Sequence, residues 1–114
     1  MHAYGNAFIH PFNYAGAEST QLRDEFPKAD VFYKAVWTSG LMPTGMVYGN
    51  FDSTVNYPVN GGASDYMLAT HNIYAISVML GTTSVASQQF YLDDATILKS
   101  VCDVNYPWFT FAMT

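Results

Sequence analysis

Charge and cysteine are both scarce in this sequence, and the two shortages exclude several classes of protein. Only 11% of the 114 residues are charged, and four basic residues stand against nine acidic ones, for a net charge of −5 at pH 7. Four basic side chains cannot form the positive surface that nucleic-acid phosphates require, so a nucleic-acid partner is excluded. The single cysteine, Cys102, excludes an internal disulfide, and its apolar neighbours predict a buried, inert thiol.

Long apolar runs and targeting signals are also missing. No uninterrupted apolar run reaches the ~18–20 residues of a membrane span, so no span is expected. The first residues, MHAYGN, carry neither the basic nor the apolar part of a signal peptide. The low lysine content, together with many Tyr, Asn, Gly and Thr residues, favours an extracellular protein.

What the sequence does contain is apolar and aromatic. Half of the residues are apolar and 17% are aromatic, a composition that excludes intrinsic disorder. The length fits one small domain, and no internal repeat or linker divides it, so residues 1–114 form a single segment.

Periodicity and turn residues predict the elements of the first half. Ala7–Phe12 reads as a short buried strand that Pro11 ends. Ser19 and Thr20 are N-cap residues for a first helical turn, and Pro27 restarts a longer helix that runs to Gly40. In that helix an apolar face is predicted at Val31, Phe32, Ala35 and Val36. The following stretch, 41–54, reads as a long loop with a short strand at 46–48.

The second half predicts one central strand and one helix. Asn60-Gly61-Gly62 is a turn signal, and Ile73–Leu80 reads as a strand buried on both faces. Asp93 or Asp94 is expected to cap a final helix, which Pro107 should stop or kink. Strands alternating with helices predict an α/β fold with a partial mixed sheet flanked by helices. A strand buried on both faces needs neighbours on both edges, so we expect the missing strands to come from elsewhere.

Two segments carry motifs that are more specific than these patterns. MHAYGNAFIHPFNY opens the chain, and YPVNGGASDYMLATHNIYAISVMLGT ends in the predicted central strand. Both resemble the zinc metallocarboxypeptidases of the M14, carboxypeptidase A-like family, in the family's own order. The resemblance places His2 at a zinc histidine, Tyr4 at the aromatic residue after it, and Tyr57 at a substrate-contacting tyrosine. Asp65 begins the family's Asp–aromatic pair. The resemblance implies that essentially the whole chain corresponds to the C-terminal half of the family's fold.

The departures from the family pattern concern its chemistry. Met79 stands where the family has a catalytic glutamate, which acts as general base toward a zinc-bound water and then as proton donor. A thioether has no titratable proton and can do neither. The family's His-x-x-Glu zinc pair and carboxylate-binding arginines lie upstream of the resembling region, and this sequence contains no His-x-x-Glu. We therefore expect no cofactor from this chain alone, and zinc at His2 only if the upstream half is present.

Two functions are consistent with this pattern. The first is a non-catalytic, carboxypeptidase-like structural or interaction protein, which completes its sheet with another polypeptide or with copies of itself. The alternative is the C-terminal piece of a split or truncated zinc carboxypeptidase that hydrolyses C-terminal peptide bonds. In the first case Met79 is core and Tyr57 is an ordinary loop residue. In the second, Tyr57 contacts the C-terminus of a peptide.

Overall fold

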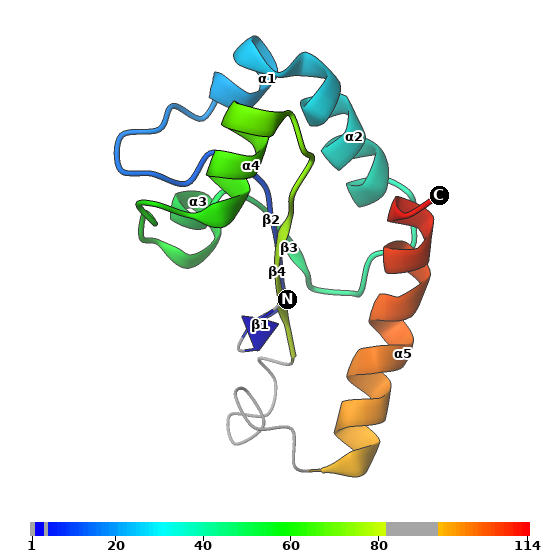
Figure 1. Cartoon of the computed structure of the whole chain (residues 1–114). Coiled ribbons are helices and arrows are strands. Elements are labelled where there is room, and N and C mark those ends of the chain that lie inside the picture. The colour runs from blue at the N-terminus through cyan, green and yellow to red at the C-terminus, as the bar shows by residue number, and fades with distance from the viewer. Residues whose placement is uncertain (1, 4, 82–93) are drawn as a thin grey trace.

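The computed structural model describes residues 2–3, 5–81 and 94–114, which form a mixed four-stranded sheet with helices around it (Figure 1). The strands, in their order across the sheet, are β1 (His2–Ala3), β4 (Ser77–Leu80), β2 (Ala7–Ile9) and β3 (Val47–Gly49). The β1–β4 and β2–β3 pairs are parallel, whereas β2 and β4 are antiparallel. The predicted α/β class with a partial mixed sheet is confirmed.

Five helices accompany the sheet in the described part of the chain. They are α1 (Gln21–Glu25), α2 (Pro27–Trp37), α3 (Phe51–Val55), α4 (Ala63–His71) and α5 (Ala95–Ala112). Figure 1 shows α2 and α5 on one side of the sheet and α3 on the other. Among the described residues no helix is both long and apolar enough to cross a membrane.

The alternation of side chains along the strands divides the core into two parts. Phe8 and Val78 belong to the larger cluster, where they join Tyr33 of α2 and Trp108 of α5. Ala7, Ile9 and Met79 form a smaller cluster, and the partly buried Phe51 and Val55 of α3 pack against it. Because adjacent residues face opposite sides, Val78 and Met79 lie in different clusters, and β4 is buried on both faces as predicted.

The sheet does not lack neighbours for its central strand, which corrects the sequence prediction. Strand β4 pairs with β1 on one side and with β2 on the other. The strand is also shorter than the predicted 73–80, since it begins at Ser77 and Ile73 is 52% exposed. The prediction failed because the two-residue β1 is too short to be recognised from periodicity.

Helix α2 is rotated relative to the predicted apolar face, and it ends at Trp37 rather than at Gly40. Of the predicted face only Val36 is buried, while Val31 is 67% exposed. Tyr33 is fully buried instead, and its hydroxyl donates to Ala75 O over 2.8 Å. The ring of Tyr33 buries more apolar surface than Val31 would, and its hydroxyl has a hydrogen-bond partner. The helix is therefore rotated so that Tyr33 faces the core.

The predicted loop 41–54 contains more structure than expected. It includes β3, close to the predicted strand, and also α3, which was not predicted. Helix α3 begins with a capping box, in which Asn50 Oδ1 accepts from Ser53 N (2.9 Å) and Ser53 Oγ accepts from Asn50 N (3.1 Å). Helix α4 was also missed, although the predicted turn is present, with Gly61 at φ 71°.

The last helix confirms one prediction, overturns a second, and contradicts one of the two alternatives in a third. Asp94 caps α5 by accepting from Thr96 N (2.8 Å), whereas Asp93 lies outside the described residues. Pro107 does not stop the helix, which continues to Ala112 and buries Trp108 in the core. The free energy gained by burying the Trp108 indole exceeds the free energy lost with the hydrogen bond that proline cannot make. Cys102 is exposed rather than buried, because the helix turns Val101 toward the core instead.

Candidate functional site

A cavity of about 430 Å³ lies on the sheet face that carries the smaller core cluster. Four parts of the chain line it: the start of β2, the approach to β3, the end of α3 with the loop that follows, and β4. The lining residues are Gly5, Asn6, Ala7, Gly45, Val47, Thr54, Val55, Tyr57 and Met79. Two of the three residues singled out from the sequence, Tyr57 and Met79, therefore share one cavity.

Met79 forms the floor of the cavity and is only 6% exposed. In the sheet it lies between two neighbours, since its Cα is in register with His2 of β1 on one side and with Ala7 of β2 on the other. Gly5, at φ 109°, brings its backbone against this floor, and a Cβ there would lie 3.7 Å from Met79 Sδ. The sheet thus places the backbone of His2, the third predicted residue, beside Met79.

Tyr57 also lines the cavity and is half exposed, at 51%. Its ring packs on Phe51 of α3, with 5.9 Å between the ring centroids. Thr54 and Val55, the last two residues of α3, line the cavity beside Tyr57. Tyr57 therefore lies in the loop after α3, and contact with that helix holds its ring in place.

This part of the cavity lining is tied to the rest of the fold by Asn13, which sequence reasoning did not single out. Asn13 is 2% exposed, and its Oδ1 accepts from Phe51 N over 2.7 Å. Its own N and Nδ2 donate to the two carboxylate oxygens of Asp65, over 2.8 and 3.1 Å. Burial raises the pKa of the Asp65 carboxyl above its usual value, although the bonds from Asn13 oppose that shift. Asp65 thus has a structural role, because its carboxylate holds Asn13 in place.

The chemistry available at the cavity surface is limited. Among the lining residues no side chain is a carboxylate, an imidazole, a thiol or an ammonium group. The Thr54 hydroxyl already donates to Asn50 O (2.7 Å), and the Asn6 amide donates to Thr44 O (3.3 Å). The described residues of this cavity therefore suit binding through apolar contact and a few hydrogen bonds more than proton transfer.

The comparison with protein families identifies the relationship that these features suggest. A model of the family Peptidase M14, described as zinc carboxypeptidase, matches residues 1–105. The chain belongs to the zinc carboxypeptidase family. Searches of curated proteins and of solved structures found no match to it.

A zinc site of the carboxypeptidase kind needs three protein ligands and an open position. Within the described residues, no group of three His, Cys, Asp or Glu side chains could hold a metal ion. His2 lies in β1, but its side chain is outside the described part, as is Tyr4. The described residues of this carboxypeptidase relative therefore do not make a complete zinc site by themselves.

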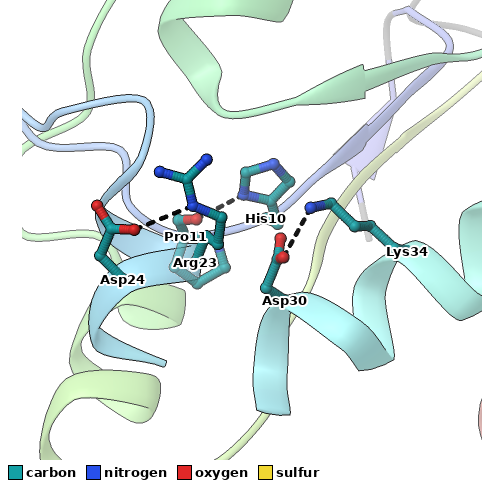
Figure 2. Close-up of polar contacts among 6 residues, drawn as sticks. All are labelled: His10, Pro11, Arg23, Asp24, Asp30 and Lys34. Atoms are coloured by element: carbon teal, nitrogen blue, oxygen red, sulfur yellow. Dashed lines mark hydrogen bonds and ion pairs between the residues drawn. The ribbon is translucent and has the colours of Figure 1, made fainter. Parts of the chain in front are cut away.

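A second polar cluster lies at the other end of β2, centred on His10 (Figure 2). The imidazole lies beside Tyr48 of β3, 4.9 Å between centroids, and its Nδ1 is hydrogen-bonded to Pro11 O. Burial lowers the pKa of His10 below its usual value, and this effect exceeds the opposing bond to Pro11. Figure 2 shows Asp30 of α2 nearby, paired with Lys34 over 2.7 Å. The packing of His10 against aromatic rings gave no signal in the sequence.

Proposed function

We propose that this carboxypeptidase relative is a non-catalytic interaction protein, which binds peptide segments in the cavity between Met79 and Tyr57. The observation that carries the proposal is the buried thioether of Met79 at the cavity floor, where the family resemblance places a glutamate. Hydrolysis of a peptide bond needs a group that accepts and returns a proton, and such groups contribute ~10²–10⁴-fold to the rate. Methionine has no such proton, and no other lining side chain in the described cavity is a carboxylate that could take the place of the glutamate.

The cavity suits an apolar or aromatic side chain of a peptide. Ala7, Val47, Val55 and Met79 supply its apolar surface, and Tyr57 offers a half-exposed ring and hydroxyl at the rim. An apolar side chain that enters would remove this surface from water, at roughly 25 cal/mol per Å². Tyr57 could hydrogen-bond the peptide backbone at the entrance.

The interaction role also extends to the edges of the sheet. Strands β1 and β3 each have one neighbour in the described sheet. Val47 of β3 is 46% exposed, and α5 exposes further apolar side chains, such as Tyr106 at 68% and Met113 at 74%. Exposed apolar surface beside an open strand edge is typical of a protein that associates with another polypeptide or with copies of itself.

A direct test compares binding with hydrolysis for one probe, N-benzoylglycyl-phenylalanine, in the presence of zinc. We expect calorimetry to detect binding, and chromatography to find no cleavage beyond that in buffer. Tyr57→Ala should weaken binding, whereas Tyr66→Ala should not, because Tyr66 is 60% exposed and lies outside the cavity. Zinc-dependent cleavage by the natural chain would contradict a non-catalytic role, and absence of binding would contradict the assignment of the cavity.

The alternative is the C-terminal piece of a split zinc carboxypeptidase. It is favoured by the register that sets His2 beside Met79, in a sheet whose cavity also includes Tyr57. In that case an N-terminal piece would supply the other zinc ligands and the carboxylate-binding arginine. Mixing the chain with such a piece and measuring both bound zinc and peptidase activity separates the alternatives, since the interaction role predicts a complex without activity.

A further inference from the structure

Asn13 uses every polar group it has, and the bonds reach three other residues in two segments. The backbone N and the side-chain Nδ2 donate to Asp65 of α4, over 2.8 and 3.1 Å. The side-chain Oδ1 accepts from Phe51 N, and the backbone O accepts from Val59 N, both over 2.7 Å. A residue that is 2% exposed and so connected is a junction in the fold.

Phe51 and Val59, the two residues that donate to Asn13, lie on either side of the residues that form one wall of the cavity. Between these residues lie Thr54, Val55 and Tyr57, which all line the cavity. Asn13 is absent from the cavity lining, so it acts on the cavity only through the segment that it holds.

We propose that Asn13 is the positioning residue of this wall: it holds both ends of segment 51–59, and Asp65 fixes its orientation. The proposal deepens the binding function above and rests on it for its consequence, since a correctly placed Tyr57 is what the peptide would meet.

The chemistry of the junction requires an amide at position 13. Phe51 N–H needs an acceptor, whereas the Asp65 carboxylate needs a donor, and a primary amide offers both in one planar group. Replacing Asn13 with aspartate keeps the acceptor and the shape, but it turns a carboxylate toward the Asp65 carboxylate. Replacing Asp65 with asparagine at the same time reverses the pair, because the new amide can donate to position 13 and still accept from its backbone N–H.

Hydrogen exchange measures the position of the wall without any ligand. In Asn13→Asp we expect the amides of Phe51 and Val59 to exchange about tenfold faster or more. The repulsion between the two carboxylates displaces residue 13, and with it the side-chain and backbone oxygens that accept from these amides. The Asp30 amide in α2, bonded to Phe26 O over 3.0 Å, is the internal reference and should not change. The double variant Asn13→Asp/Asp65→Asn should restore exchange to within about threefold of the natural protein.

Peptide binding gives the second measurement, on the same variants with N-benzoylglycyl-phenylalanine. Asn13→Asp should bind about tenfold more weakly or worse, and the double variant should recover. Asn72→Asp makes the same chemical change at an exposed position outside the cavity and should bind normally. If Asn13→Asp does not fold, the exchange and peptide binding of the folded double variant still test the proposal.

Several results would overturn the positioning role. One is unchanged exchange at Phe51 and Val59 in Asn13→Asp, and another is equal acceleration at Asp30, which would indicate general destabilisation. Failure of the double variant to recover exchange would do so too. If instead the natural protein binds no peptide while the exchange pattern is as expected, the proposed binding function fails and the positioning of the wall stands.

Discussion

The side chain of Tyr48 combines favourable and unfavourable packing in one residue. Its ring stacks on Trp37, at 5.2 Å between centroids, and on Phe8, at 5.7 Å. Its hydroxyl is buried and has no hydrogen-bond partner in the part of the chain that the structure describes. Burial raises the pKa of this phenol to about 12, so the hydroxyl remains protonated at neutral pH.

Tyr48→Phe should therefore not destabilise the protein, and it should raise the free energy of unfolding by about 1 kcal/mol, because an unsatisfied buried hydroxyl is removed. Tyr48→Ala is the matched comparison and should cost about 3 kcal/mol or more through loss of the stacked ring. Urea unfolding followed by tryptophan fluorescence measures both. A clear loss of stability in Tyr48→Phe would indicate that the hydroxyl has a partner after all.

His10 should make stability depend on pH in the mildly acidic range. Because burial lowers the pKa of His10 below 6.5 in the folded protein, the unfolded chain binds a proton more readily. The free energy of unfolding should then fall as the pH drops below about 6.5, until the folded imidazole is protonated as well. Above that pH the contribution is constant.

Urea unfolding across this range, compared between the natural protein and His10→Asn, isolates the effect. His10→Asn should have a flatter profile, while His71→Asn should resemble the natural protein because His71 is exposed. Parallel profiles for the natural protein and His10→Asn would show that groups other than His10 govern the pH dependence.

Among the elements, α5 contains a residue that lowers the stability of its own helix. Pro107 lies within the helix and has no N–H to donate to the carbonyl four residues earlier. Pro107→Ala should restore that bond and improve helix propensity, for a gain of about 1–3 kcal/mol and a higher helical signal in circular dichroism. Ser100→Ala, at an exposed position of the same helix, serves as a control for propensity alone. A loss of stability in Pro107→Ala would mean that the proline ring packs in a way that alanine cannot replace.

The elements also show where sequence patterns are sufficient. Helix α5 was predicted from Asp93 or Asp94 as its cap, and β2 from a short apolar run, because each signal lies within a few neighbouring residues. Helix α3 was missed, although Asn50 and Ser53 form a capping box, since five residues are too few for a period to appear. The rotation of α2 was missed because it depends on Tyr33 reaching Ala75, a contact 42 residues away.

At the scale of the whole molecule, the candidate site was predictable only in part. The resemblance to carboxypeptidases selected Tyr57 and Met79, and the structure places both in one cavity. Asn13 was not predictable, because its importance comes from bonds to residues 38 and 52 positions away. Contacts of that range follow from the packed fold and leave no local pattern in the sequence.

The surface of the whole molecule has two properties with opposite effects on self-association, and the resulting association should be measurable. A net charge of −5 repels copies of the chain, while α5 exposes a run of apolar side chains that favours their association. Raising the salt concentration from about 0.05 to 0.5 M screens the repulsion and leaves the apolar attraction in place. We therefore expect sedimentation velocity to show association that grows with both protein and salt concentration.

The part played by α5 can be separated from general surface effects. Tyr106→Lys should weaken the association, because it places a charge in the apolar surface of α5. Val31→Lys on α2 adds the same charge at an equally exposed position, 67% against 68% for Tyr106, and should have little effect. A chain that stays monomeric at every salt concentration would contradict self-assembly, and equal effects of the two substitutions would show that net charge, and not the surface of α5, governs the association.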